Sequence, residues 1–271
     1  MYTLVIGVDR SHLDQLQLVW PTWMKNKPSM RKHRVVCFYD RLTVQPEDLY
    51  ARFVPMPQQL TLQPWPPLGV LPTDYGAAAV DKWSNPQRAM MLSGFIAVAA
   101  ATVQTPYWLK LDLDVVATGK DNWIDSHWFE TNPSMVSHPW GYTKPPDQIL
   151  KLDAWVERHK NKPGMSFLAA QPPLNLVPNP GSSMVKHKRI ISWCAFFNTQ
   201  FTKLCSSLAR ETCLPGTIPV PSQDGFMFYV AKRLGYEIPT VNMKRRGWEH
   251  HNGTANVRKA VERALNPVKA I

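Results

Sequence analysis

Cysteine and long apolar runs are both scarce in this chain of 271 residues. The four cysteines show no C-x-x-C spacing, which argues against a zinc site and favours reduced thiols. The longest apolar run, from Gly94 to Val103, is about half of what crosses a bilayer. The first residues lack the basic start and apolar core of a secretory signal. These absences predict a cytoplasmic protein without a membrane span.

Acidic residues are fewer than basic residues, but only in two segments of the chain. The 31 Lys and Arg residues outnumber the 20 Asp and Glu residues, which gives a net charge of +11. Residues 143–189 contribute +5 and residues 232–271 contribute +6, whereas residues 1–142 and 190–231 are each neutral. If the two basic segments share a face, that face attracts a polyanion; a solvated basic surface is the alternative interpretation.

The apolar patterns predict an α/β fold. Residues 2–9 and 34–40 are typical of buried strands, and the spacing of residues 13–24 predicts a helix that Pro21 bends or ends. Two strands joined by a helix predict parallel pairing. The other expected elements are helices over 86–103, 148–158, 223–234 and 256–265 and strands over 107–111 and 190–198.

Proline is abundant, with 25 residues, and favours stiff connections. Residues 55–75 are rich in Pro and Gln and are predicted to form a long loop. Residues 131–189 are dense in Pro, Gly, Asn and Lys, so we interpret them as an insertion or a mobile lid.

Asp112 and Asp114 follow the predicted strand over 107–111. Carboxylates at positions i and i+2 of an extended backbone point to the same side, where they repel each other unless a cation joins them. A hard cation such as Mn²⁺ or Mg²⁺ would leave coordination positions open for phosphate oxygens. D-x-D is a weak motif by itself and also fits an acidic turn, but the buried strand before it favours a cation site.

The chain resembles the GT-A glycosyltransferases. The resemblance rests on the opening strand-helix-strand, the run WLKLDLDVV over 108–116, the run QDGF over 223–226 and the late pair His250-His251. It implies one GT-A domain over 1–271, with a Rossmann-type mixed sheet flanked by helices. Residues 1–120 would be the nucleotide-sugar-binding half and 121–271 the acceptor-binding half. It also implies that Asp112 lies near the ribose or the metal and that Asp114 is the direct metal ligand.

Two further residues gain roles from the resemblance. Asp224 takes the place of the general base that removes the acceptor proton in inverting members, although an acid there also suits a helix cap. His250 completes the metal shell, with His251 as the alternative. A surface histidine pair beside the turn at residues 252–253 is the other interpretation of that motif.

Further candidate contacts to the nucleoside-diphosphate sugar lie at the ends of predicted elements. The resemblance puts base contacts at Asp9 and Arg10, after the first strand, and Asp40 ends the second strand. Lys82 and Arg88 flank the start of the helix over 86–103 and could reach the diphosphate. Each of these residues, taken alone, also fits a plain surface charge.

The basic segments favour a nucleic acid as the sugar acceptor. The candidate phosphate contacts are Lys144, Lys186, Lys188, Arg189, Lys244, Arg245 and Arg246. Aromatic residues that could stack on an extruded base lie among them, namely Trp140, Tyr142, Trp155, Trp193, Phe196 and Phe197. The chain is similar in character to the enzymes that glucosylate hydroxymethylpyrimidines in DNA, of the base J glucosyltransferase type and its phage relatives. This similarity implies an enzyme that moves glucose from UDP-glucose to the hydroxymethyl group of a modified pyrimidine in duplex DNA, including in the cytoplasm of a phage-infected host. We also expect a monomer.

Three other functions stay open. The acceptor could be a glycan or a lipid-linked precursor, in which case the basic surface would meet an anionic membrane. A phosphatase of the haloacid dehalogenase type also uses D-x-D after a strand, but it has the motif near the N-terminus, followed by Gly-Thr, whereas Val115 and Val116 follow it here. A nucleic-acid-binding protein with a decayed catalytic core is the third.

Overall fold

The computed structural model describes residues 2–65, 86–119, 121–144, 147–174, 185–213, 219 and 223–266. Residues 66–85, with Lys82, lie outside it.

The main sheet has six strands in the described ranges, in the order β3-β2-β1-β4-β7-β6. They are β1 (Tyr2–Val8), β2 (Val35–Asp40), β3 (Leu60–Trp65), β4 (Tyr107–Leu111), β6 (Met135–Lys144) and β7 (Val185–Asn198). The first four are parallel to one another, whereas β7 runs antiparallel to β4 and β6 antiparallel to β7. The expected mixed sheet is therefore confirmed.

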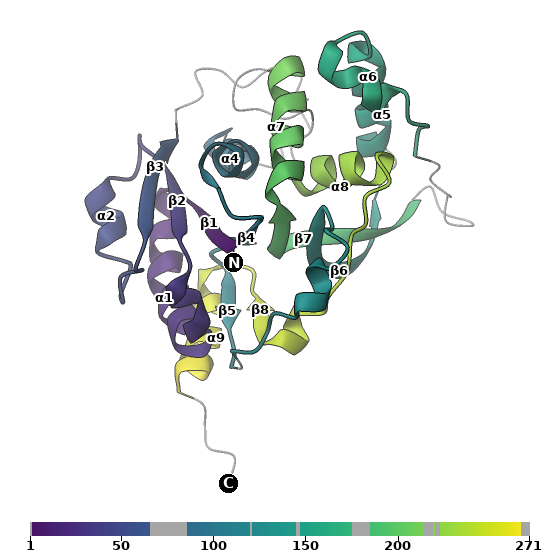
Figure 1. The fold of residues 1–271 in the computed structure, drawn as a ribbon. Helices are drawn as coiled ribbons and strands as arrows, with labels where there is room; N and C mark the ends of the chain where they lie inside the picture. Colours follow the sequence, from purple (N-terminus) through teal and green to yellow (C-terminus); the bar gives the residue numbers. More distant parts are fainter. Residues whose placement is uncertain are drawn as a thin grey trace.

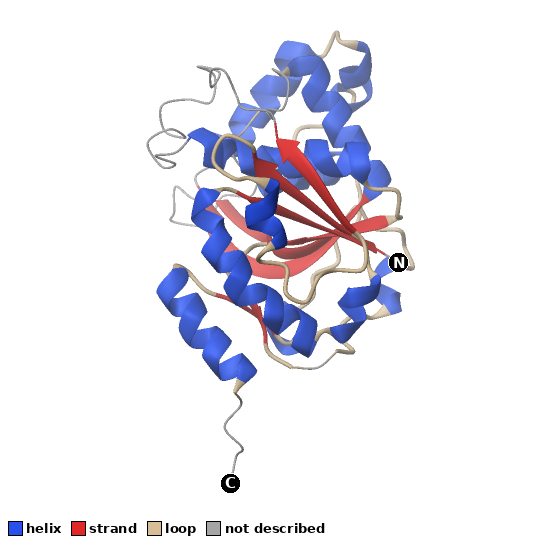
Figure 2. Ribbon diagram, turned by 90° about the vertical axis from the view of Figure 1, so that its left-hand side faces the viewer, coloured by secondary structure: helices blue, strands red, loops and turns tan. Residues whose placement is uncertain are grey.

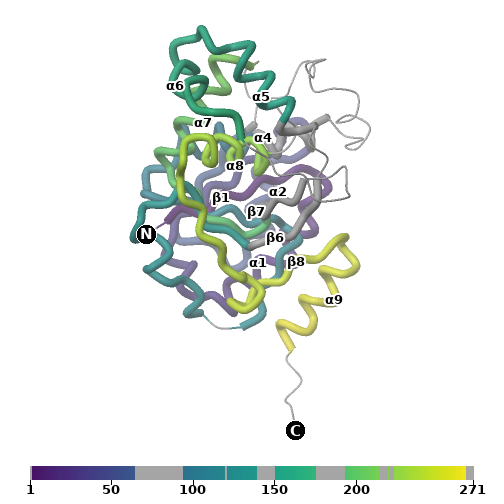
Figure 3. Tube along the Cα trace, turned by 90° about the vertical axis from the view of Figure 1, so that its right-hand side faces the viewer, coloured from purple at the N-terminus to yellow at the C-terminus, as the bar shows by residue number. Residues whose placement is uncertain are grey.

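Helices cover both faces of this sheet (Figures 1 and 2). The α-helices are α1 (Leu13–Asn26), α2 (Pro46–Tyr50), α4 (Pro86–Thr102), α5 (Asp147–His159), α6 (Ser166–Ala169), α7 (Thr199–Thr212), α8 (Gln223–Arg233) and α9 (Thr254–Leu265). The short 3-10 helices are η1 (Arg10–His12), η2 (Pro28–Lys32), η4 (Ser126–Phe129), η5 (Pro163–Met165) and η6 (Met243–Arg246). Figure 3 shows α9 far from α5 and α6, which lie at the opposite end of the molecule.

Alternation along β4 divides the core into two apolar layers. Neighbouring strand residues point to opposite faces, so Trp108 packs in the layer with α4 and α7 and Leu109 in the layer with α1 and α9. Trp20 and Trp23 of α1 are fully buried in the second layer. Burying a large apolar side chain contributes roughly 2 kcal/mol or more, so these layers hold the ends of the parallel strands in fixed positions.

A second, two-stranded sheet joins distant parts of the sequence. β5 (Val115–Ala117) pairs antiparallel with β8 (Trp248–His250), with Val115 opposite His250. The chain enters β8 through Gly247, whose φ of 77° favours glycine and whose position leaves no room for a Cβ beside the carbonyl of Gly119. This pairing brings the end of β8 to the residues that follow β4.

Two local expectations were wrong in part, and a bend of the helix at Pro21 stays a prediction. Pro21 does not end α1, which continues to Asn26, because Trp23 and Met24 are buried after it and the Thr22 hydroxyl donates to the Val19 carbonyl (2.7 Å). Part of the loop predicted over 55–75 is the edge strand β3, which pairs in parallel with β2. The patterns also did not predict α7.

Within residues 131–189, β6 joins the main sheet and α5 covers the predicted helical stretch over 148–158. The division into halves and the lid stay predictions. No helix in the described ranges has both the length and the apolar character to cross a membrane. The four cysteines are free thiols.

Candidate active site

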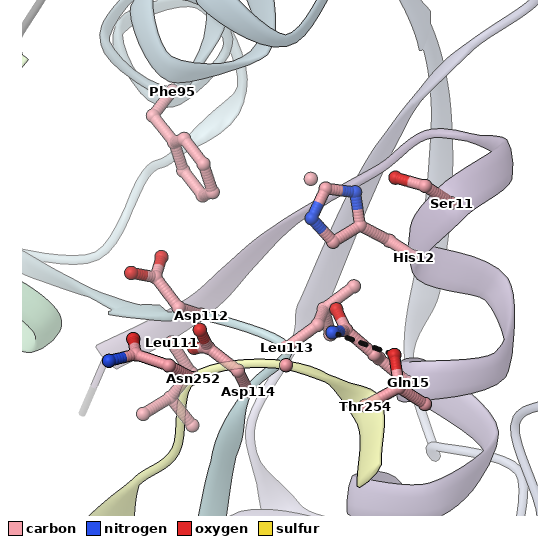
Figure 4. A pocket seen from close by; sticks show the side chains of 12 residues that line it. Ser11, His12, Gln15, Phe95, Leu111, Asp112, Leu113, Asp114, Asn252 and Thr254 are labelled. Atoms are coloured by element: carbon pink, nitrogen blue, oxygen red, sulfur yellow. Dashed lines mark hydrogen bonds between the residues drawn. The ribbon is translucent and has the colours of Figure 1, made fainter. Parts of the chain in front are cut away.

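A cavity of about 440 Å³ opens at the carboxyl ends of β1 and β4. Residues from the β1–α1 connection, from α4, from the turn after β4 and from the segment after β8 line it (Figure 4). They are Gly7, Ser11, His12, Gln15, Phe95, Leu111, Asp112, Leu113, Asp114, Asn252, Gly253 and Thr254. Ligands of open α/β sheets bind at this edge.

Asp112 lies in the cavity wall with its carboxylate near a buried ammonium. The Lys110 Nζ atom donates to Asp112 Oδ1, and the backbone N–H of Asp112 donates to the Trp193 carbonyl of β7 (2.9 Å). Burial raises the pKa of Asp112, and the charges of Asp114 and Asp224 add to this, although Lys110 opposes it. Lys110 therefore holds the carboxylate in place, while the like charges of Asp114 and Asp224 act on it.

Asp114 faces His250. Its Oδ2 atom is 3.3 Å from His250 Nε2, while its Oδ1 atom is buried without a hydrogen-bond partner. Burial lowers the pKa of His250, but the hydrogen bond and charge of Asp114 outweigh this and raise it. His251 points elsewhere, with Nε2 3.2 Å from Glu249 Oε2, and its backbone N–H donates to the Asp114 carbonyl (2.9 Å).

These side chains fit a divalent cation. A buried carboxylate oxygen without a partner is costly, and a cation would satisfy it. Two carboxylates and an imidazole are a ligand set suited to Mn²⁺. Among the described residues no three His, Cys, Asp or Glu side chains already converge as a finished ligand cluster. Asp112 instead contacts Lys110 through one of its oxygens.

Asp224 lies in the first turn of α8, as predicted. Its negative charge contributes to the raised pKa of Asp112, so the structure brings the two carboxylates into electrostatic range. Asp224 is partly buried and is not among the residues that line the cavity. Its assignment as general base stays a prediction.

The end of β1 is organised by Asp9, which is 5% exposed. Its Oδ1 atom accepts hydrogen bonds from the backbone N–H of Ser11 (2.8 Å) and His12 (3.2 Å) and from the Ser11 hydroxyl (2.6 Å), and it lies 2.8 Å from His12 Nδ1. Ser11 and His12 line the cavity, whereas Asp9 caps η1 behind them. Asp9 was predicted from the sequence, but Ser11 and His12, which it positions, were not; the pattern D-x-S-H is a capping signal that indicates them.

Among the described residues, the predicted donor contacts Arg10 and Asp40 do not line this cavity. Arg10 is exposed and lies 3.9 Å from Asp48. Asp40 is buried and accepts from the Leu42 N–H (3.0 Å) and the Thr43 hydroxyl (2.8 Å). Arg88 lies in the first turns of α4, but its side chain, like all of Lys82, falls outside the described part.

The predicted nucleic-acid contacts lie on β6, β7 and η6. Lys144 ends β6, and Lys186, Lys188 and Arg189 lie on the paired stretch of β7; the structure describes only their backbone. Lys244 and Arg245 are exposed on η6.

Arg246, also on η6, is partly engaged within the chain. Its guanidinium lies 5.1 Å from the centre of the Trp128 ring and 3.8 Å from Asp125.

Four of the aromatic residues expected to stack on a base are part of the core. Trp155, Trp193, Phe196 and Phe197 are each at most 6% exposed, so this part of the nucleic-acid argument was wrong. These aromatic residues lie near basic residues in the sequence, but β7 and α5 pack their apolar faces inward and so bury the aromatic side chains. The side chains of Trp140 and Tyr142 lie outside the described part.

No protein-family model matches the sequence, and no curated protein sequence matches it. Solved structures do. Core-mannan synthase A (CmsA/Ktr4) from Aspergillus fumigatus in an Mn/GDP form superposes with a TM-score of 0.56 at 14% identity, over 87% of this chain and 69% of that one. The mannosyltransferase Ktr4p from S. cerevisiae in complex with GDP gives 0.53 at 11%, over 96% and 80%.

The galactosyltransferase LgtC, in complex with donor and acceptor sugar analogues, gives a TM-score of 0.50 at 8% identity, over 98% of both chains. At these identities the likeness concerns the fold. The six-stranded mixed sheet flanked by helices is the fold of GT-A glycosyltransferases.

Proposed function

We propose that this chain is a metal-dependent glycosyltransferase that uses a nucleoside-diphosphate sugar as donor. One observation carries the proposal: at the carboxyl end of β4, Asp114 presents a buried oxygen without a hydrogen-bond partner, next to Asp112 and 3.3 Å from His250. The solved structures of the same fold that carry Mn/GDP or GDP support a donor of this class.

Asp112, Asp114 and His250 would hold the cation. When bound, a divalent cation offsets the negative charge that develops on the departing nucleoside diphosphate. The acceptor hydroxyl would attack the anomeric carbon of the donor as the bond from that carbon to the diphosphate oxygen breaks. Asp224, in electrostatic range of Asp112, would take the hydroxyl proton as general base in an inverting reaction.

Two acceptor classes are proposed, each with its own support. A hydroxymethylpyrimidine in DNA is supported by the segregated positive charge, including the exposed Lys244 and Arg245, but it loses the support of the four buried aromatic residues. A glycan acceptor is supported by the mannosyltransferases and the galactosyltransferase that share the fold.

The test is incubation of the purified chain with Mn²⁺ and UDP-glucose, UDP-galactose or GDP-mannose. Acceptors are duplex DNA with 5-hydroxymethylcytosine, a mannose oligosaccharide and lactose, and products are measured by mass spectrometry. We expect transfer that EDTA abolishes, and its acceptor identifies the class. DNA binding without any donor turnover would contradict the proposal in favour of the non-catalytic alternative. Phosphate release from simple monoesters would favour the phosphatase.

A further inference from the structure

Lys110 is a buried cation in the middle of the main sheet. It lies on β4 between Val5 of β1 and Ala195 of β7, and it is 1% exposed. Burying an ammonium group is expensive unless a counter-charge accompanies it. A lysine in the central strand of a sheet therefore needs a nearby negative charge that offsets the cost of burying its ammonium group.

The ammonium group of Lys110 reaches along β4 to the candidate cation site. Residues i and i+2 of a strand share a face, so Lys110 and Asp112 project to the same side, and Nζ contacts Asp112 Oδ1. The Phe95 ring of α4 covers the ammonium, with its centre 4.9 Å from Nζ. Phe95 also lines the cavity, so the ammonium lies just behind the cavity wall.

The site around Lys110 is rich in negative charge. Asp114 and Asp224 both act on Asp112 with like charge, and Lys110 acts on it with opposite charge. Without a bound cation, three carboxylates in this small region would repel one another at reduced dielectric. The ammonium of Lys110 offsets part of that repulsion from inside the fold.

We propose that Lys110 is a built-in counter-charge of the cation site. Its ammonium group keeps the aspartates in place when no metal is bound. It also lowers their affinity for the metal, because it competes with the metal for Asp112. The inference rests on the proposed function, because it presumes that the site binds a divalent cation. It makes Lys110 a positioning residue whose charge tunes how readily the cation enters and how readily it leaves with the nucleoside diphosphate.

The experiment compares the wild type with Lys110→Met, which keeps most of the stem, and Lys110→Gln, which keeps a hydrogen-bond donor for Asp112 but not the charge. Mn²⁺ affinity is measured by electron paramagnetic resonance of free Mn²⁺, and melting temperature is measured with and without saturating Mn²⁺. The matched control is Lys27→Met. Lys27 is also fully buried, but its Nζ donates to the carbonyls of Gly119 and Arg246, and it does not line the cavity.

Both Lys110 variants should bind Mn²⁺ at least about fivefold more tightly than the wild type, because one opposing charge has been removed. Their metal-free melting temperature should fall by several degrees, and Mn²⁺ should raise it by more than it raises that of the wild type. Lys27→Met should lose stability without a change in Mn²⁺ affinity. A merely structural role for Lys110 would reproduce the behaviour of Lys27→Met.

Unchanged or weaker Mn²⁺ binding in both Lys110 variants, with normal binding by the wild type, overturns the role of Lys110 alone. No Mn²⁺ binding by the wild type or the variants overturns the proposed cation site as well. If the single variants do not fold, adding Asp112→Asn to Lys110→Met removes the excess negative charge and should restore folding without metal. A double variant as unstable as the single one would show that packing, rather than charge, requires Lys110.

Discussion

The neighbouring strands β1 and β4 both end near aspartates, but the two ends are built differently. After β1, Asp9 uses one oxygen to bind the backbone and side chains of Ser11 and His12. After β4, Asp112 contacts a buried ammonium, and Asp114 keeps a buried oxygen without a partner. Asp9 is bonded within its own turn, whereas Asp114 keeps one buried oxygen that a ligand in the cavity could satisfy.

The same contrast is visible in the protonation equilibria. Burial would raise the pKa of Asp9, but the hydrogen bonds and charge of His12 and the hydrogen bonds of Ser11 lower it to about 2. Burial and neighbouring carboxylates raise the pKa of Asp112. A carboxylate satisfied by its own chain has little capacity left for a cation, and an unsatisfied one has much. In this chain Asp114, which keeps a buried oxygen without a partner, is therefore a better candidate for a ligand site than Asp9.

The largest expected effect comes from Asp114→Asn. The change keeps the shape but removes the charge that would hold the proposed cation, so sugar transfer should fall at least about a hundredfold. Steady-state kinetics at saturating Mn²⁺ measures this. Asp40→Asn is the control, because both oxygens of Asp40 are bonded within its own turn, and it should keep transfer within about threefold. Similar losses of transfer in both variants would contradict the proposed difference between Asp114 and an aspartate bonded within its own turn.

Asp9→Asn should reduce stability rather than cation affinity. The folded-state pKa of Asp9, about 2, lies below its ordinary value of 3.8, so its charge stabilises the fold fully above about pH 4 and progressively less as the pH falls toward 2. The variant should therefore lose about 2 kcal/mol at pH 7, and the gap to the wild type should narrow between about pH 4 and pH 2. Urea unfolding at several pH values measures this, and a gap that does not change with pH would contradict the assignment.

His250→Ala should weaken Mn²⁺ binding by about tenfold, and His251→Ala should leave it unchanged. The two variants are a matched pair, because His250 and His251 are adjacent in the sequence but contact different carboxylates. His250 contacts Asp114, and His251 contacts Glu249. Protonated imidazole cannot bind metal, and the pKa of His250 is raised, so Mn²⁺ affinity in the wild type should fall as the pH drops through that pKa. This pH dependence should weaken in His250→Ala and persist in His251→Ala.

The smallest effect is expected for Trp193→Phe. The Trp193 ring stacks on His250, with ring centres 5.8 Å apart and planes at 26°. A smaller ring should orient the imidazole less firmly and weaken Mn²⁺ binding by about threefold. Trp108→Phe is the control, because Trp108 is equally buried but stacks on Phe197. Equal Mn²⁺ affinity in the two variants would show that the stacking is structural only.

Local patterns sufficed to predict most strands and helices and the position of Asp112 and Asp114, because a buried strand followed by two acids is a short-range signal. Elements that depend on contacts between distant segments carry no such short-range signal. β3 contains proline and glutamine, and only its pairing with β2 makes it a strand. The residues Asn252 and Thr254 line the cavity because β8 pairs with β5, which no local pattern indicates. The composition of α5 and β7 likewise did not reveal that their aromatic residues face the core.

The pairing of β5 with β8 also has a thermodynamic consequence. His250 reaches Asp114 only when the late segment is docked on the strand that follows β4, a contact across more than a hundred residues of chain. By linkage, any cation held by both segments binds the docked state more tightly and stabilises the docking by the same free energy. A bound metal would then link the segment after β4 to the segment that begins at Trp248. Loss of the metal would first weaken the docking of this later segment.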